Sequence, residues 1–227
     1  MARHSTPVDA QRSGGRRGTL NEQRWLEILS AAAEEFYENG YKAARLQDIG
    51  RRVGLLTGSL YYYIDSKEDL LFALVDTAHR KGLAIITEDV ASAGNDAPTR
   101  LRDFIARHVR LQLESGADVV AVVERDRRHL SAEHRAQVDA MRRKLHRFVA
   151  GLVAQGIAEG YFDPAVDPNV VSTTLFLLLN STSDWARDLS KLSEVTDWYV
   201  RLFLNGLAAD SNLAARMESE WSVGTHR

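Results

Sequence analysis

The stretch that decides the fold is residues 46–70, LQDIGRRVGLLTGSLYYYIDSKEDL. Its apolar residues recur at helical spacing over 46–53 and again over about 57–63, and Gly54 can provide a sharp turn between the two segments. Both predicted helices are short, and longer amphipathic segments stand on either side of them. Two short helices in that setting are typical of a helix-turn-helix.

The segment before this stretch predicts a long amphipathic helix over about 20–38. Thr19 and Glu22 have the spacing of a capping box at its start. Asn39-Gly40 is a stop signal, because glycine adopts the left-handed conformation without a Cβ clash.

The segment after the stretch predicts a helix from about 67 into the eighties, with Ser66 and Asp69 as a second capping pair. A linker is expected within 91–98, ASAGNDAP. Further helices are expected over about 98–114, 117–129, 132–160, 168–189 and 193–209. No stretch alternates as a strand would. The predicted fold class is all-α, with about nine helices in an N-terminal three-helix helix-turn-helix domain and a C-terminal helical bundle.

Composition narrows the classes of protein. The chain has 227 residues, of which 44% are hydrophobic and 26% charged, as in an ordinary globular protein. The absence of cysteine excludes disulfides, thiolate metal sites and cysteine nucleophiles. No apolar run approaches the roughly 20 residues that span a bilayer, and the first residues lack the apolar core of a signal peptide. We therefore expect a cytoplasmic protein without a membrane partner.

Charge is distributed unevenly, although the formal net charge is only −2. Residues 1–24 hold five arginines against two acidic residues, and residues 42–52 hold four basic residues against Asp48. Two basic patches near one end of the chain are compatible with a surface that faces phosphate. A flexible tail and a solvated helix face are the alternative.

The second short helix carries the side chains expected of a helix that enters the major groove of DNA. Small and hydrogen-bonding residues at 57–59 allow a close approach to base edges. The hydroxyls of the tyrosines at 61–63 can bond phosphate oxygens. Leu60 and Ile64 are expected to face inward and hold the helix in place.

Three sequence blocks stand at regular separations around these helices: GYKAARLQDI (40–49), GSLYYY (58–63) and SKEDL (66–70), with Gly54 between the first two. At these residues the sequence resembles the DNA-binding domain of the TetR family of bacterial regulators. In that family the start of the second helix meets the DNA backbone, and the turn and the third helix approach bases and backbone. A lysine at the start of the fourth helix pairs with phosphate. The DNA-contacting residues that the resemblance implies are Arg45, Leu46, Gln47, Leu56, Thr57, Gly58, Ser59, Tyr61, Tyr62, Tyr63 and Lys67.

The chain departs from the family's pattern at several positions. Tyr63 stands where histidine is frequent, and Ile64 replaces phenylalanine in a core position. Gly50 stands where alanine is common, which should cost the helix about 1 kcal/mol of propensity. Leu56 stands where a serine often caps the third helix, so Thr57 is the expected cap instead.

The last two predicted helices are apolar on more than one side, which indicates burial on more than one side. In the TetR family these helices pair with their mates in a four-helix dimer interface, so the resemblance implies a homodimer. Two recognition helices about 34 Å apart can read palindromic operator DNA.

The C-terminal domain is expected to hold a small-molecule effector. Candidate walls of its cavity are Phe104, His108, Leu111, Val122, Phe148, Leu152, Phe176 and Trp185, with plain core packing as the alternative for each. Cations gather in the run 124–128 and on the face of Arg142, Arg143, Lys144 and Arg147, and a polyanionic effector needs such groups. A salt-bridged, solvated face is the alternative there.

The segments GYFD (160–163), WAR (185–187) and LNGL (204–207) resemble TetR-family regulators of fatty-acid and steroid catabolism. The effectors of those regulators are CoA thioesters, so the resemblance makes an acyl-CoA the candidate effector here. The candidate ligand-binding residues are Phe104, His108, Leu111, Arg125, Arg147, Phe148, Trp185 and Arg187.

The predicted organisation is a disordered basic arm (1–18), a helix-turn-helix domain (19–66), a ligand-binding and dimerisation domain (67–210) and a tail (211–227). The predicted function is a ligand-responsive repressor that its effector releases from DNA, with the helix from about 67 carrying the shift. An activator or a ligand-independent DNA-binding protein of the same fold is the alternative.

An enzyme is the main rival class. The sequence contains no glycine-rich phosphate loop, no nucleophile elbow and no histidine pair with metal-ligand spacing. His129 and His134 are five apart and would point to different faces of one helix. We therefore expect no catalytic residue, no cofactor and no metal site.

Overall fold

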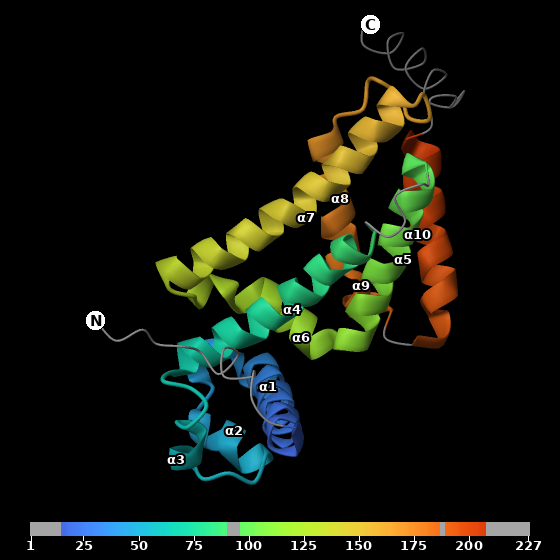
Figure 1. Cartoon of the computed structure of the whole chain (residues 1–227). Helices are drawn as coiled ribbons and strands as arrows, with labels where there is room; N and C mark the ends of the chain where they lie inside the picture. The colour runs from blue at the N-terminus through green and yellow to red at the C-terminus, as the bar shows by residue number, and fades with distance from the viewer. Residues whose placement is uncertain (1–14, 90–95, 187–188, 208–227) are drawn as a thin grey trace, which may run out of the picture. The chain divides into compact units, whose positions relative to one another are not determined.

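The computed structural model describes residues 15–89, 96–186 and 189–207, and these ranges consist of helices joined by turns and loops (Figure 1). The helices are α1 (Gly15–Ala43), α2 (Leu46–Arg52), α3 (Thr57–Leu60), α4 (Lys67–Asp89), α5 (Ala97–Ser115), α6 (Ala117–Asp126), α7 (Ala132–Ala158), α8 (Pro168–Asn180), α9 (Thr182–Trp185) and α10 (Leu192–Leu207). Short 3-10 helices, η3 (Arg127–His129) and η4 (Leu189–Lys191), precede α7 and α10. The predicted all-α class is confirmed.

The chain divides into two compact units, which do not follow the predicted boundary. The N-terminal unit comprises the described residues up to His79 together with Asp118–Asp139, and the C-terminal unit comprises Arg80–Ala117 and the chain from Ala140 onward. The helix-turn-helix domain expected over 19–66 is therefore smaller than the unit that forms. The reason is that Lys67 at the start of α4 binds carbonyls at the end of α1, and the His129 ring of η3 stacks on Tyr41.

Local sequence signals place several helix ends. Gly40 has φ 73° and ψ 151°, so helical geometry is interrupted at the expected stop. Ser66 Oγ donates to the Asp69 carboxylate at 2.8 Å and accepts from the Asp69 N–H at 3.1 Å, which confirms the capping pair before α4. Asp96 caps α5 by accepting from the Thr99 N–H, and Asp167 caps α8 by accepting from the N–H groups of Asn169 and Val170.

Other predicted boundaries are wrong. α1 begins at Gly15, so Thr19 lies inside the helix instead of capping it, and residues 15–18 are helical instead of part of a disordered arm. The segment predicted as one helix over 168–189 is divided into α8 and α9 by Ser181. Residues 1–14 of the expected arm and the tail at 211–227 lie outside the described residues.

The C-terminal unit is built around α5, α7, α8 and α10, and α10 packs along α5 (Figure 1). Its most deeply buried side chains include Leu101, Phe104, Ile105, Val149, Val153, Leu175, Leu179 and Tyr199. The end of α10 is attached to the loop before α8, because the Asp163 N–H donates to the Leu207 carbonyl at 2.8 Å. Within the described residues, no helix combines the length and apolarity that a membrane span requires.

Candidate functional site

Residues 54–63, here called the reading segment, present large side chains to solvent. The exposed fraction is 82% for Leu56, 81% for Tyr62 and 54% for Tyr61, whereas Leu60 and Ile64 are buried. The division into an outward and an inward face is thus as predicted. Tyr63 belongs to the packing, because its half-buried ring stacks on Trp25 with centroids 6.4 Å apart.

The reading segment is held in place by a close approach at Gly50. A Cβ atom at this residue would lie 2.9 Å from the backbone oxygen of Leu55 and 3.3 Å from Leu60 Cδ1. The Gly50 carbonyl accepts from the Leu55 N–H at 2.8 Å, and the turn passes through Gly54 with φ 67°. Glycine at position 50 therefore does more than lower the helix propensity of α2. It allows the turn to approach α2, since a side chain there would push the turn away.

Leu56, and not Thr57, is the N-cap residue of α3. No side chain caps this helix, so the predicted capping by Thr57 is wrong: Thr57 already occupies the first helical position. The Leu56 carbonyl accepts from the Ser59 N–H at 2.8 Å. The short helix thus begins with an aliphatic side chain in solvent, followed by half-buried Thr57 and exposed Gly58 and Ser59.

The predicted residues at the start of α2 also face outward. Arg45 is the N-cap residue, and its side chain and that of Gln47 are exposed, whereas Leu46 is half-buried. Within the part of the chain that the structure describes, the Arg45 guanidinium makes no ion pair. It is accordingly placed as a cation available to an anionic partner.

The two arginines at the end of α2 have different surroundings. Arg51 is 72% exposed and pairs with Asp48 at 3.0 Å. Arg52 lies against α1 and binds Glu34, Glu38 and the buried Glu35, and its hydrogen bond to Glu38 is the main cause that raises its pKa. Arg52 therefore stabilises the packing of α2 on α1 and does not belong to a phosphate-facing patch.

The ammonium group of Lys67 is also bound within the protein, which corrects its predicted role as a phosphate ligand. Its ammonium donates to the carbonyls of Tyr41, Lys42 and Ala44 at 2.7, 3.1 and 2.9 Å. These three bonds use all three N–H donors of an ammonium group. The group also lies 4.7 Å from the centre of the Tyr41 ring, and its burial lowers the pKa of Lys67.

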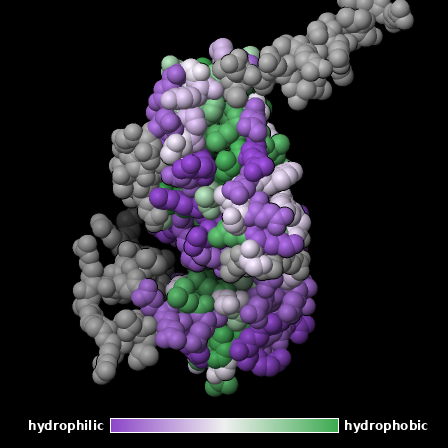
Figure 2. Space-filling view, turned by 90° about the vertical axis from the view of Figure 1, so that its right-hand side faces the viewer, coloured by the Kyte–Doolittle hydropathy of each residue, from purple (hydrophilic) through white to green (hydrophobic). Residues whose placement is uncertain are grey.

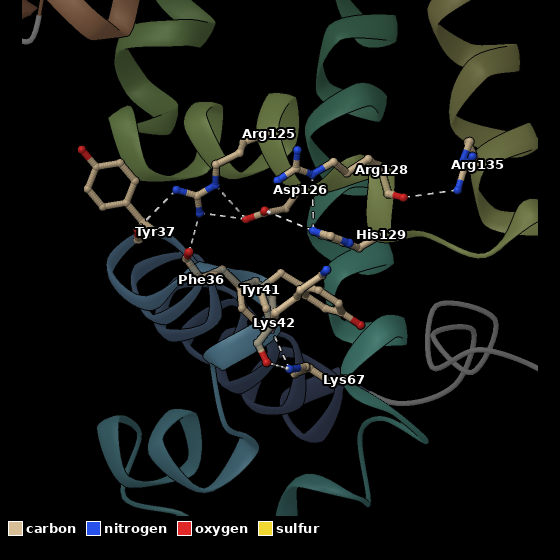
Figure 3. Close-up of polar contacts among 10 residues, drawn as sticks. All are labelled: Phe36, Tyr37, Tyr41, Lys42, Lys67, Arg125, Asp126, Arg128, His129 and Arg135. Atoms are coloured by element: carbon tan, nitrogen blue, oxygen red, sulfur yellow. Dashed lines mark hydrogen bonds and ion pairs between the residues drawn. The ribbon is translucent and has the colours of Figure 1, made fainter.

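A second cation, Arg125 of α6, closes the same end of α1 (Figure 3). Its guanidinium donates to the carbonyls of Phe36 and Tyr37 and binds the buried Asp126 carboxylate at 2.8 Å. The carbonyls at the end of a helix lack partners within the helix, so cations are favourable there. Arg125 was predicted to bind the effector. It lies instead in the N-terminal unit, apart from the aromatic candidates, and is used by the fold.

His129 of η3 completes this contact, here called the α1 end (residues 36–44 with Lys67, Arg125 and His129). Its ring stacks on Tyr41 with centroids 5.1 Å apart (Figure 3). Burial, followed by the charges of Arg128, Lys42 and Lys67, lowers the pKa of His129, whereas Asp126 opposes that shift. Burial also raises the pKa of Tyr41.

Glu68, next to Lys67, joins α4 to the start of α7. Its carboxylate accepts from the Ser131 N–H at 2.8 Å and contacts His134 Nδ1 at 2.9 Å. His134 stacks on Phe72 with centroids 3.8 Å apart. Side-chain ligand atoms of Glu68, Asp69 and His134 lie within 4.8 Å of one another, but hydrogen bonds of two helix starts already use both carboxylates. Sequence reasoning missed this cluster because its members are separated by more than sixty residues.

The interior of the C-terminal unit brings together several predicted effector residues. Phe104 lies 5.7 Å from both His108 and Phe148, measured between ring centroids. Phe176 joins the group from α8, and half-buried Leu111 packs against the same core. Val122 is buried in the N-terminal unit and is not part of this group.

Polar groups that the sequence analysis missed lie within this aromatic interior. Gln112 Nε2 donates to Asn180 Oδ1 at 3.0 Å and contacts His108 Nε2 at 3.1 Å. His146 contacts Ser172 Oγ at 3.2 Å, and burial followed by the charge of Arg142 lowers its pKa. Helical spacing would have placed Gln112 one turn from His108, but no sequence signal points to Asn180 or His146.

The structure does not place the other predicted effector residues in this interior. Arg147 is exposed on α7, and Arg187 lies outside the described residues. Trp185 is 56% exposed and lines an open groove of about 490 Å³ with Leu178, Ser181, Glu194, Val195, Trp198 and Tyr199. The four aromatic predictions that stay together are therefore Phe104, His108, Phe148 and Phe176.

Apolar residues also reach the surface of α8 and α10. Leu177 on α8 and Trp198 and Leu202 on α10 are exposed, and Leu177 lies on the face of α8 opposite to its buried residues. The space-filling view from the side of α10 shows hydrophobic residues between hydrophilic ones over this unit (Figure 2). Large exposed apolar side chains on neighbouring helices mark an interaction surface.

A helix-turn-helix with an exposed reading segment, joined to a helical unit with an aromatic interior, defines a DNA-binding regulator by its fold. Residues 28–74 match the family model described as bacterial regulatory proteins, tetR family, and residues 94–207 match tetracyclin repressor-like, C-terminal domain. The chain belongs to the tetR family of transcription regulators.

Known proteins resemble the chain over most of its length. It is 25% identical to the HTH-type transcriptional repressor KstR2 of Rhodococcus jostii (strain RHA1), over 91% of this chain and 100% of that protein. It is 22% identical to the fatty acid metabolism regulator protein of Bacillus subtilis (strain 168), over 81% of this chain and 95% of that protein. The structure of AibR in complex with isovaleryl coenzyme A and operator DNA has the same fold, with a TM-score of 0.67 at 24% identity, covering 80% of this chain and 98% of that one.

Proposed function

We propose that the chain is a transcriptional repressor that binds palindromic operator DNA as a homodimer and is released by a small-molecule effector. The observation that carries the proposal is the reading segment: Leu56, Tyr61 and Tyr62 stand in solvent on a turn that backbone hydrogen bonds and Gly50 hold rigidly. Large side chains exposed together on one short segment mark a surface that another molecule covers.

The DNA-binding residues that we propose follow the exposed side chains. They are Arg45, Gln47, Leu56, Gly58, Ser59, Tyr61 and Tyr62, with half-buried Leu46, Thr57 and Tyr63 in support. Exposed Arg45 is suited to phosphate, and the hydroxyls of Tyr61 and Tyr62 can donate to phosphate or base acceptors. Lys67 leaves this set, because three carbonyls occupy its ammonium.

The proposed dimer forms through α8 and α10. Val170, Thr173, Thr174 and Leu177 recur at helical spacing on the exposed face of α8, and Trp198 and Leu202 do so on α10. A partner copy would cover these side chains, and a two-fold dimer would present two reading segments to a palindrome.

The proposed effector is a CoA thioester whose acyl part enters the interior around Phe104, His108 and Phe148. Support comes from the isovaleryl coenzyme A bound by AibR and from the fatty-acid regulator among the relatives. The polar groups of this interior are the imidazoles of His108 and His146, two amides and a hydroxyl, and burial lowers the pKa of His146, so the interior suits an uncharged group. Exposed Arg147 and Arg187, which lies outside the described residues, are the proposed phosphate partners.

Release would act through α4, which contributes residues 67–79 to the N-terminal unit and 80–89 to the C-terminal unit. An effector can shift the balance between DNA-bound and released states only by binding them with different affinity. A displaced α4 would carry Lys67 and Glu68 away from the α1 end and from α7.

The test of DNA binding is selection of duplexes from a random library with the full-length protein, followed by gel shifts. Tyr62→Ala should weaken binding to the selected duplex at least tenfold without changing thermal unfolding, because the side chain is exposed. The matched control is Tyr161→Ala, which removes an exposed tyrosine of the C-terminal unit and should leave binding unchanged. Equal affinities for wild type and Tyr62→Ala would contradict the assignment of the reading segment.

The test of the effector is a series of acyl-CoAs of increasing chain length, measured by thermal shift and by release from the selected duplex. Free CoA is the control for the phosphates alone. His108→Phe, which keeps the ring volume and removes the hydrogen bonds to Gln112 and Asn180, should change the response to acyl-CoA without preventing DNA binding. No shift with any thioester would contradict the proposed effector and leave DNA binding untouched.

A further inference from the structure

Leu56 differs from the other exposed residues of the reading segment because its side chain is aliphatic. It is 82% exposed, and its neighbours on this surface offer hydroxyl groups or no side chain at all. An aliphatic side chain gives nothing to a phosphate oxygen. If this surface meets DNA, Leu56 needs an apolar partner there.

The position of Leu56 is fixed from both sides by the backbone. The preceding residue, Leu55, donates its N–H to the Gly50 carbonyl at 2.8 Å, and the Leu56 carbonyl accepts from the Ser59 N–H at 2.8 Å. Its φ of −68° and ψ of 148° are unstrained. The backbone therefore fixes the point from which this apolar side chain projects, at the start of the helix, the part from which helix-turn-helix proteins contact base edges.

The major groove offers one apolar group, the C5 methyl of thymine. We infer that Leu56 is a specificity-determining residue that selects a thymine in each operator half-site by packing against that methyl group. The inference rests on the proposed DNA binding and adds to it the identity of a base. It also gives a function to the residue at which this chain has leucine and no side-chain cap.

Deoxyuridine tests the contact directly, because it differs from thymidine only by the missing methyl and keeps the O4 acceptor and the base pairing. Starting from the selected duplex, each thymine is replaced by uracil in turn, and the dissociation constant of the full-length protein is measured at fixed salt. At one thymine per half-site, wild type should bind about fourfold more weakly after the replacement, the value for one buried methyl group.

The same replacements are then measured with Leu56→Ala. This variant should unfold like wild type, since the side chain is exposed, and should bind the thymine and uracil duplexes with equal affinity at the critical position. The two changes should not be additive, because each removes one half of the same contact. Tyr62→Phe is the matched control: it alters an adjacent exposed side chain and should retain the fourfold response to uracil.

Two results would overturn the inference. If the selected duplex is bound but the effect of every methyl group is the same in wild type and Leu56→Ala, Leu56 does not read thymine, and the proposed DNA binding stands. If no duplex is selected at all, both proposals fail. If Leu56→Ala loses the same affinity for every sequence, the inference about thymine is also overturned, since such a loss indicates contact with the sugar-phosphate backbone.

Discussion

Two regions of the N-terminal unit have similar residues and opposite surroundings. The reading segment and the α1 end are both rich in tyrosine and lie next to basic residues. In the first, Leu56, Tyr61 and Tyr62 stand in solvent. In the second, Lys67 and Arg125 bind five backbone carbonyls at the end of α1. Residue type alone therefore does not distinguish a surface that binds a partner from a contact that holds the fold together. The distinction depends on the acceptors near each cation, because carbonyls at a helix end attract cations as phosphates do.

The largest effect is expected for Lys67→Met, which keeps the stem and removes the ammonium. Three carbonyls at the α1 end would lose their charged donor, so we expect the free energy of unfolding to fall by about 3 kcal/mol. Urea unfolding followed by circular dichroism measures the loss. DNA binding should fall only as far as the folded fraction does.

The control for Lys67→Met is Lys42→Met, the same change at an exposed side chain whose own carbonyl is one of the acceptors. It should alter stability by less than about 0.5 kcal/mol. If Lys67→Met is as stable as wild type but has lost affinity for DNA, the ammonium contacts phosphate after all, and the comparison between the two regions is broken.

Gly50→Ala is expected to have the next largest effect, and it acts on the support of the reading segment. The new Cβ would lie 2.9 Å from a backbone oxygen, which cannot rotate away as a side chain can. We expect a loss of about 2 kcal/mol, despite the better helix propensity of alanine. Differential scanning calorimetry measures it.

Gly58→Ala is the matched change, at an exposed glycine with open space around its Cβ position. It should leave stability unchanged or raise it, while weakening DNA binding, because the added methyl enters the surface that approaches the bases. Equal stability losses in both variants would show that the close approach at Gly50 has no energetic consequence.

The parts of this unit that the sequence predicted are those decided by residues close together in the chain. The stop at Gly40 and the pair Ser66 and Asp69 depend on neighbours within one turn, and both were correctly predicted. The roles of Lys67 and Arg125 were not, because their acceptors lie 23 to 26 and 88 to 89 residues away in the chain. Composition shows that a cation is present, but not which oxygen it reaches.

The interior of the C-terminal unit shows the same limit. Phe104, His108, Phe148 and Phe176 were named together as candidate walls, and the structure brings their rings into contact. Gln112 and Asn180 were missed because the second partner comes from α8, 68 residues further along. Trp185 was misplaced, since the divided helix at Ser181 leaves it on the surface.

Two adjacent arginines of α2 allow the same comparison between a cation bound within the protein and a cation exposed to a partner. Arg52→Met removes the partner of buried Glu35 and of two exposed carboxylates, so we expect a loss of about 1 to 2 kcal/mol. Arg51→Met removes one exposed pair and should change stability by less than about 0.5 kcal/mol. The salt dependence of DNA binding distinguishes them further: a shallower slope is expected for Arg51→Met if that residue meets a phosphate, and an unchanged slope for Arg52→Met.

The smallest expected effect is the change in stability at low pH, and it should arise in only one of the two regions, because only one contains a histidine. The reading segment contains none, whereas the α1 end contains His129, whose pKa is lowered first by burial and then by nearby cations. A histidine with a lowered pKa binds its proton less readily when folded than when unfolded. Its contribution to stability is complete above the unfolded pKa of about 6.5 and is lost as the pH falls toward the folded pKa.

Stability should therefore decline on acidification from pH 7, with a slope of at most about 1.4 kcal/mol per pH unit for each such histidine. His129→Gln should reduce the slope measured between pH 7 and 5.5, whatever it does to the stability at pH 7. The pKa of His146 in the C-terminal unit is also lowered, so His146 still contributes to the pH dependence of stability in that variant. The double variant His129→Gln/His146→Gln should therefore show a smaller slope than His129→Gln alone. An unchanged slope in the single variant would mean that His129 titrates alike in the folded and unfolded chain. The cations at the α1 end would then bind carbonyls without crowding the ring that stacks on Tyr41.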